Sequence, residues 1–193
     1  VLFSVKNLGE LSDRIKDRLL SYGEQMSSKI VSAFLQSEGF PAVFQDSRKL
    51  IATDSHFGNA NVDSRKTNEN LKNWKLENQI YVVTGFIAKD KNDDTTTLGR
   101  GGSDYTAAIL GSGLKADEIQ IWTDVDGFLT ADPRLVKNAF SQSELSYQEA
   151  MEMSYFGAKV IYPPTMIPAI ESQIPIYIKN TFKPESQGTL IHQ

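Results

Sequence analysis

The first forty residues carry apolar positions at a helical period. One apolar series predicts a helix over residues 8–20: Leu8, Leu11, Ile15 and Leu19. Gly23 interrupts this pattern, and a second helix is expected over residues 24–37, with Gly39 as its stop. The apolar face of this second helix consists of Met26, Ile30, Ala33 and Phe34. Glu24 falls in its first turn, where a carboxylate complements the helix dipole.

Short apolar runs predict strands in the middle of the chain. Residues 40–44 read as a buried strand, and residues 79–87 are apolar enough for the centre of a parallel sheet. Residues 118–123 form the next strand-like run. A helix over residues 105–110 separates these last two strands, so we expect a right-handed crossover. Residues 53–69 are polar and rich in Gly and Asn, which predicts a long mobile loop.

The last third of the chain continues the alternation of helices and strands. Ser146 and Glu149 have the spacing of a capping box, which predicts a helix over residues 146–153. Further elements are a helix over residues 163–172 and strands over residues 174–178 and 189–191.

The composition limits the class of protein. The chain has 193 residues, of which 40% are hydrophobic, which is enough for one domain or two small lobes. Its net charge of −4 disfavours nucleic acid or an anionic membrane as the main partner. There are no cysteines, which excludes disulfides and fits a cytoplasmic location. No apolar run approaches the roughly 20 residues of a membrane span.

A glycine-rich stretch between a predicted strand and a predicted helix is the best candidate site. It reads Thr-Thr-Thr-Leu-Gly-Arg-Gly-Gly-Ser-Asp over residues 95–104. Glycines let the backbone approach a ligand, and the N–H groups of a helix start favour anions. Arg100 suits a carboxylate or phosphate, Ser103 or Asp104 could serve as N-cap, and Asp104 could accept from an ammonium group. A cation and an anion together favour a zwitterionic ligand such as an amino acid.

Two other interpretations of this stretch remain. It could be only a tight turn with a solvated Arg100. It could also be an RNA-binding Arg-Gly-Gly box, but a single copy in an acidic chain disfavours that.

Other polar residues give weaker signals. Asp124-Val-Asp126-Gly127 has half the spacing of a calcium loop, but the remaining ligands are absent, which excludes an EF-hand. His56 has no second ligand nearby, so no metal site is predicted. Lys159, after the Gly157 turn, suits a phosphate but could be a solvated lysine.

Taken together, these stretches resemble an aspartokinase over essentially the whole chain. The resemblance rests on segments in the family's order and spacing: Ser21 to Glu24, Thr95 to Asp104, Trp122 to Val125, Thr130 to Arg134 and Phe156 to Val160. It is most similar to the monofunctional, lysine-sensitive branch. The resemblance implies the amino-acid-kinase fold, an α/β fold with a mostly parallel sheet sandwiched between helices.

The resemblance also implies the reaction and the residues involved. The family transfers the γ-phosphoryl group of ATP, with Mg²⁺ held mainly through the nucleotide phosphates, to the β-carboxylate of L-aspartate. The implied aspartate-binding residues are Glu24, Phe86, Thr97, Arg100, Gly101, Gly102, Ser103 and Asp104. The implied nucleotide-binding residues are Thr123, Asp124, Leu129, Arg134, Lys159 and Val160. Among them, Arg100, Asp104 and Lys159 would take part in catalysis.

The sequence departs from the family pattern at its ends. The family's Lys-Phe-Gly-Gly-Thr-Ser segment and its C-terminal regulatory domains are absent, so we expect an N-terminally incomplete, inactive fragment of a homo-oligomer. Residues 1–78 would be the remainder of the amino-acid-binding lobe and residues 79–193 the nucleotide-binding lobe. Leu129 and Tyr162 stand where relatives can carry Tyr and His. Two alternatives remain: another amino-acid kinase, with a glutamate or carbamate-type acceptor, or a module that only binds nucleotide or amino acid.

Overall fold

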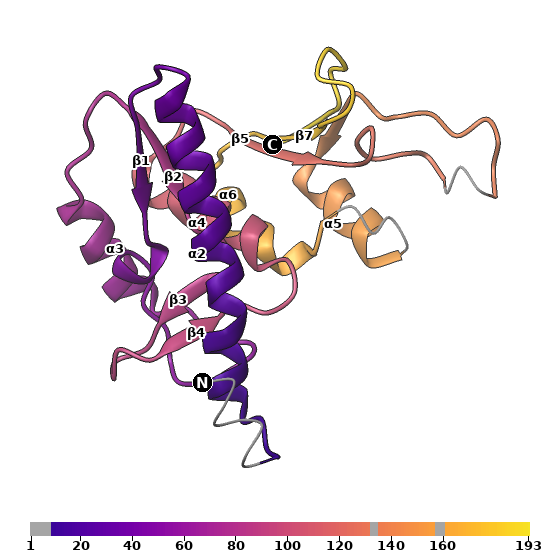
Figure 1. Cartoon of the computed structure of the whole chain (residues 1–193). Coiled ribbons are helices and arrows are strands. Elements are labelled where there is room, and N and C mark those ends of the chain that lie inside the picture. Colours follow the sequence, from indigo (N-terminus) through magenta and orange to yellow (C-terminus); the bar gives the residue numbers. More distant parts are fainter. Residues whose placement is uncertain (1–8, 132–134, 157–160) are drawn as a thin grey trace. The chain divides into compact units, whose positions relative to one another are not determined.

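The computed structural model describes residues 9–131, 135–156 and 161–193 of an α/β protein (Figure 1). The chain divides into two compact units, Val1–Ser103 and Asp104–Gln193, and each is described by itself. The division falls within the first turn of helix α4 (Gly102–Leu114).

The first unit begins with one long helix, α2, which spans Asp13–Ser37. Ser12 caps it, since its hydroxyl accepts from the N–H of Ile15. The prediction of two helices separated by Gly23 was wrong. A glycine inside a helix costs only about 1 kcal/mol relative to alanine, and packing against the strands of this unit offsets that cost.

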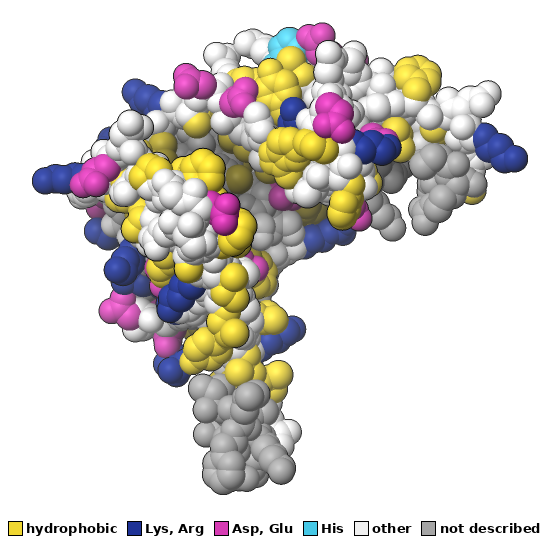
Figure 2. All heavy atoms as spheres, turned by 45° about the horizontal axis from the view of Figure 1, so that its top comes forward, with side chains coloured by type: hydrophobic (Ala, Val, Ile, Leu, Met, Phe, Trp, Pro, Cys, Tyr) yellow, Lys and Arg dark blue, Asp and Glu magenta, His cyan; other side chains and the backbone are white. Residues whose placement is uncertain are grey.

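Helix α2 turns a polar face inward and an apolar face outward. Its buried residues are Asp17, Ser21, Ser28 and Ser32. Figure 2 shows hydrophobic side chains at the surface among the charged ones. On α2, Met26, Ile30 and Phe34 are each at least 60% exposed. The predicted apolar face is therefore a real face, but in the described residues it does not cover the core.

The strands of the first unit form two small sheets. Strand β1 (Ala42–Gln45) pairs in parallel with β2 (Ile80–Val83), and β3 (Ile87–Lys89) pairs antiparallel with β4 (Thr95–Thr97). The run over residues 79–87 was predicted as one strand and is in fact broken between β2 and β3.

A buried hydroxyl pair explains this break. Ser47 lies in the short helix η1 (Ser47–Lys49) that follows β1. Its hydroxyl lies 2.7 Å from that of Thr84 and donates to the carbonyl of Ile87 at 2.6 Å. The Ser47 N–H also donates to the Thr84 hydroxyl. These bonds satisfy polar groups that would otherwise be paired along a strand.

The polar stretch over residues 53–69 is more ordered than predicted. Thr53 forms a bridge with Val62, and helix α3 (Ser64–Asn73) begins within the last third of this stretch. Asp63 caps this helix by accepting from the N–H of Lys66.

The second unit is a four-stranded mixed sheet with helices. The strand order is β5-β7-β8-β6, with β5 and β7 parallel and β7 and β8 antiparallel. Its strands are β5 (Ile119–Thr123), β6 (Glu144–Ser146), β7 (Ile176–Asn180) and β8 (Thr189–His192). Its helices, besides α4, are α5 (Tyr147–Phe156), η2 (Pro163–Met166) and α6 (Ile167–Glu171). Its core includes Ile119, Phe128, Ala150, Ile178 and Ile191.

The capping box predicted for this unit is confirmed, whereas the predicted crossover is not. The capping box of α5 is present: the Ser146 N–H donates to the Glu149 carboxylate, and the Glu149 N–H donates to the Ser146 hydroxyl. The predicted crossover between residues 79–87 and 118–123 would need both strands in one sheet, but β2 belongs to the sheet β1-β2 and β5 to the sheet β5-β7-β8-β6. In the described part of the chain, no helix is both long and apolar enough to span a membrane.

Candidate functional site

The glycine-rich loop leaves the end of β4 and enters α4. Gly99 and Gly101 have φ angles of 71° and 68°, and the Gly102 N–H donates to the Gly99 carbonyl at 3.1 Å. These left-handed residues close a tight turn that starts the helix at Gly102. Ser103 and Asp104 therefore lie within the first turn of α4, and the prediction that either is the N-cap was wrong.

Phe86 packs onto this loop from the break between β2 and β3. Its φ of 66° is unusual for a residue with a side chain. Its carbonyl accepts from the N–H of Leu98 at 2.9 Å. A side chain at position 102 would meet the Phe86 ring, so Gly102 is what allows this contact. The structure thus brings together Phe86 and the loop, as the resemblance implies.

Glu24 reaches the same part of the first unit from the middle of α2. It lies eleven residues into the helix, so the interpretation of Glu24 as a dipole partner at a helix start was wrong. The Gly85 N–H bonds to its carboxylate, and Gly85 also lies beside Ser103. Burial raises the pKa of Glu24, an effect that the Gly85 hydrogen bond only partly offsets. Glu24 is thus a half-buried carboxylate beside the loop.

The polar groups of the loop differ in exposure. Arg100 and Ser103 are exposed, whereas Thr97, at the end of β4, is almost fully buried. The N–H of Thr97 and its hydroxyl both donate to Asp17, at 2.9 Å and 2.8 Å. Arg100 is therefore exposed on the loop, whereas the strand end before the loop is fixed by the two hydrogen bonds from Thr97 to Asp17.

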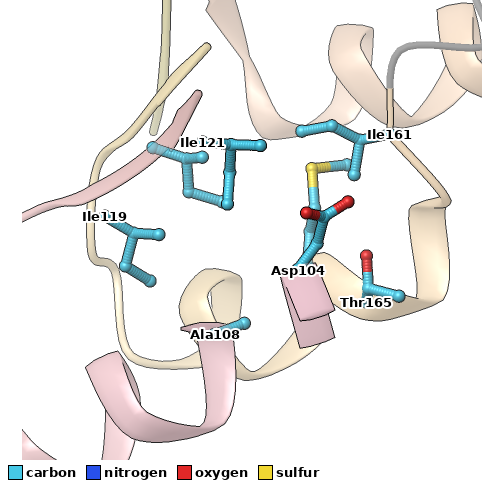
Figure 3. A pocket seen from close by; sticks show the side chains of 8 residues that line it. Asp104, Ala108, Ile119, Ile121, Ile161 and Thr165 are labelled. Atoms are coloured by element: carbon cyan, nitrogen blue, oxygen red, sulfur yellow. The ribbon is translucent and has the colours of Figure 1, made fainter. Parts of the chain in front are cut away.

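Asp104 opens the second unit and lies in an apolar hollow. Figure 3 shows its carboxyl group near Ile161 and Thr165, with Ile121 across the hollow, and burial raises the pKa of Asp104. The hollow has a volume of about 10 Å³, which holds at most one water molecule. It is therefore a desolvated environment for the carboxyl group.

The residues predicted for the nucleotide lie in the second unit or outside the described residues. Thr123 ends β5, and its hydroxyl donates to the exposed Asp124 at 3.2 Å. Leu129 forms an antiparallel bridge with Ser141, twelve positions further along the chain. Arg134, Lys159 and Val160 lie outside the described residues.

Two further features of the described residues bear on ligands. Within the described ranges, no three acidic or His side chains form a group that could hold a metal ion. A hollow of about 450 Å³ is lined by Tyr147, Met151, Glu152, Tyr155 and other residues of α5 and α6. Among the described residues, this lining includes an acid and no basic side chain.

Sequence reasoning missed Asp17, which is fully buried and bonded to Thr97. A signal was present in the sequence. Small or acidic residues recur along α2 at helical spacing, opposite the apolar face: Asp17, Ser21, Glu24, Ser28 and Ser32. Such a polar stripe marks the side of the helix that meets other polar groups.

Comparison with known proteins gives one family. The model of the amino acid kinase family matches residues 4–180. The chain is 40% identical over 183 residues to the lysine-sensitive aspartokinase 3 of Escherichia coli, covering 93% of this chain and 41% of that protein. It is 41% identical over 188 residues to the chloroplastic bifunctional aspartokinase/homoserine dehydrogenase 1 of Zea mays, covering 96% of this chain and 20% of that protein.

A solved structure agrees with these relatives. The crystal structure of E. coli aspartokinase III in complex with aspartate and ADP superposes with a TM-score of 0.90 and 39% identity, covering 94% of this chain and 41% of that one. The chain thus spans between a fifth and two fifths of the length of these relatives.

Proposed function

Because this chain belongs to the amino acid kinase family, we propose that it is part of the kinase domain of an aspartokinase. The proposed reaction transfers the γ-phosphoryl group of ATP to the β-carboxylate of L-aspartate. The observation that carries the proposal is the glycine-rich loop, which presents Arg100 at a helix start and has the carboxylate of Glu24 nearby through Gly85 and Ser103. A relative of the same fold binds aspartate and ADP.

The amino acid is proposed to bind through its two charged groups. Arg100 and the amides of Gly101, Gly102 and Ser103 would hold the α-carboxylate, because guanidinium groups and N–H groups at a helix start favour anions. Glu24, and Asp104 next to Ser103 in the sequence, are the carboxylates proposed for the ammonium group. The pKa of each is raised by burial, so an ammonium partner would stabilise its ionised form. Phe86 and Thr97 would line the same pocket.

The nucleotide is proposed to bind on the residues of the second unit. Lys159 and Arg134 would neutralise phosphate charge, and Thr123, Leu129 and Val160 would contact the rest of the nucleotide. Asp124 is an exposed carboxylate at the carboxyl end of β5, where ligands of such sheets gather. A single carboxylate beside phosphates suits Mg²⁺, which prefers phosphate and water oxygens to an all-protein cage. When bound, Mg²⁺ would neutralise charge on the phosphates.

The chemistry needs no general base. An oxygen of the β-carboxylate forms a bond to the γ-phosphorus, the bond from this phosphorus to the bridging oxygen breaks, and ADP leaves with the electron pair. The product is the acyl phosphate 4-phospho-L-aspartate. Such a transfer depends on in-line positioning and on neutralising charge. This suits a site composed of Arg, Lys, backbone amides and carboxylates.

The wider setting is part of the same proposal. The product would enter the biosynthesis of lysine, threonine and methionine, in the cytoplasm, in a homo-oligomeric enzyme. Residues 1–78 would belong to the amino-acid-binding lobe and residues 79–193 to the nucleotide-binding lobe.

The test is ADP release by the full-length protein, measured with a coupled assay. We expect release to depend on L-aspartate and to be at background with L-glutamate. N-acetyl-L-aspartate is the matched control, because it keeps both carboxylates and lacks the ammonium group. Equal or faster turnover of the acetylated compound would exclude the ammonium-binding role of Glu24 and Asp104. Turnover of glutamate alone would overturn the proposed substrate.

A further inference from the structure

Asp17 is a carboxylate that no role assigned above explains. It lies on the inner face of α2 and is fully buried. Its Oδ2 accepts from the N–H of Gly58 at 2.8 Å and from the N–H of Thr97 at 2.9 Å. Its Oδ1 accepts from the Thr97 hydroxyl at 2.8 Å. One side chain therefore joins α2, the loop around Gly58 and the end of β4.

The hydrogen-bond donors to Asp17 are two backbone N–H groups and one hydroxyl, and none of them carries a charge. Burying a carboxylate is costly unless hydrogen bonds compensate, and the three donors to Asp17 are neutral groups. A buried apolar residue would avoid that cost but would leave the N–H groups of Gly58 and Thr97 and the Thr97 hydroxyl without this acceptor. The carboxylate fixes the relative positions of its three donors, because hydrogen bonds depend on direction.

Thr97, to which Asp17 is bonded, directly precedes the glycine-rich loop. Thr97 is the last residue of β4 and comes three positions before Arg100. The Thr97 carbonyl accepts from the N–H of Ala60 at 2.9 Å, and the side chain of Asn59 fills the space beside Gly99. The segment over residues 58–60 thus packs against residues 97–99, and Asp17 bonds to both segments.

The same helix face carries Glu24, seven residues or about two turns beyond Asp17. Glu24 bonds to Gly85, which lies beside Ser103. We propose that Asp17 is a positioning residue for the amino-acid site: it fixes Thr97, and so the start of the loop that carries Arg100, relative to Glu24 on the same helix. The substrate named here rests on the proposed function.

The test compares variants of the full-length protein. Asp17→Ala should raise the KM for aspartate about ten- to hundredfold, the scale of a small misplacement of binding groups. The KM for ATP should stay within about twofold of wild type, and amide hydrogen exchange over residues 98–102 should become faster. Asp17→Asn should restore most of the affinity. Its amide oxygen can accept from both N–H groups, and its amide nitrogen can donate to the Thr97 hydroxyl.

Asp90 offers a matched control at the other end of the same hairpin. It is also a buried carboxylate, and it accepts from the N–H groups of Asn92 and Asp94. Asp90→Ala should lower the melting temperature and leave the KM for aspartate unchanged. If Asp17→Ala does not fold, Asp17→Ser is judged by the same criteria, because its hydroxyl keeps one acceptor.

Different results would contradict the role of Asp17 and the proposed function. Equal losses of melting temperature in the Asp17 and Asp90 variants, with the KM for aspartate unchanged in both, would overturn the inference. Wild-type protein without aspartate-dependent ADP release would overturn the proposed function and the substrate named here. Hydrogen exchange over residues 98–102 would still decide whether Asp17 orders the loop.

Discussion

The ring of Phe86 occupies the space in which any side chain at position 102 would begin. Its Cδ2 lies 2.7 Å from the place where a Cβ on Gly102 would stand, and the Leu98 Cβ lies 3.2 Å from that place. Contacts this short require one of the groups to move. The start of α4 and the segment that follows β2 therefore pack so closely that no room is left for even one methyl group at position 102.

Gly102→Ala should destabilise the protein by about 1–3 kcal/mol, the usual cost of overpacking. Gly23→Ala is the matched control, because Gly23 lies within α2 with no neighbouring atom in the way. It should stabilise the protein by about 0.4–1 kcal/mol. Urea unfolding of both variants measures the difference. Equal free energies of unfolding would mean that Phe86 moves aside at no cost.

Arg100→Ala should lower kcat/KM for aspartate by about 30- to 5000-fold. This range corresponds to a loss of about 2–5 kcal/mol, the scale for truncating one partner of a hydrogen-bonded charge pair. Arg100→Lys should lose less, since it keeps the charge without the guanidinium fork. Arg65→Ala removes an exposed arginine from α3 and should leave kinetics unchanged. An Arg100→Ala enzyme with wild-type kcat/KM would exclude the α-carboxylate role.

Lys159→Met should lower kcat/KM for ATP by about 10²-fold or more, the scale for losing a group that stabilises developing charge. Aspartate affinity, measured by calorimetry, should stay within about twofold, because Lys159 is proposed to act on phosphates alone. Lys72→Met, on the exposed side of α3, is the control. Parallel losses of both affinities would indicate a role in folding instead.

Asp104→Asn should change how stability depends on pH. Burial raises the pKa of Asp104 above its ordinary value of 3.8, so the folded state keeps the proton longer than the unfolded state. The wild type therefore loses stability as pH rises from 3.8 through the folded-state pKa, whereas Asp104→Asn has no such loss. The advantage of the variant should be larger at neutral pH than in acid.

Asp126 provides a control of opposite sign. Hydrogen bonds from Lys183 and Asn180 lower the pKa of Asp126. Its contribution to stability is present above its ordinary pKa and is lost as pH falls through the lowered value. Asp126→Asn should therefore be less stable than the wild type near neutral pH and approach it in acid. Urea unfolding at several pH values tests both aspartates, and the same trend in both variants would contradict these assignments.

The features that the sequence predicted well are formed by residues that lie close together in the chain. The capping box of Ser146 and Glu149 is formed by residues three apart, and the helix that follows is present. The glycine-rich turn before α4 likewise depends on conformations that glycine itself allows.

What the sequence did not show depends on distant partners. The run over residues 79–87 looks like one strand, but it is broken where Thr84 meets Ser47, 37 positions away. The apolar face of α2 was easy to recognise, yet the polar face is the one buried in the described structure. Hydrophobic periodicity predicts two faces of a helix, but the chemistry of the neighbouring strands decides which one is covered.

The bond between Asp17 and Thr97 also has a consequence for synthesis on the ribosome. The two residues are 80 positions apart. At 5–20 residues per second, Thr97 is added roughly 4–16 s after Asp17. Throughout that interval α2 can form, but the Asp17 carboxylate lacks both donors from Thr97, and the Gly58 N–H becomes available only about halfway through. A nascent chain that stalls between these two positions therefore carries the helix with Glu24 and Asp17 in place and no strand end for it to hold.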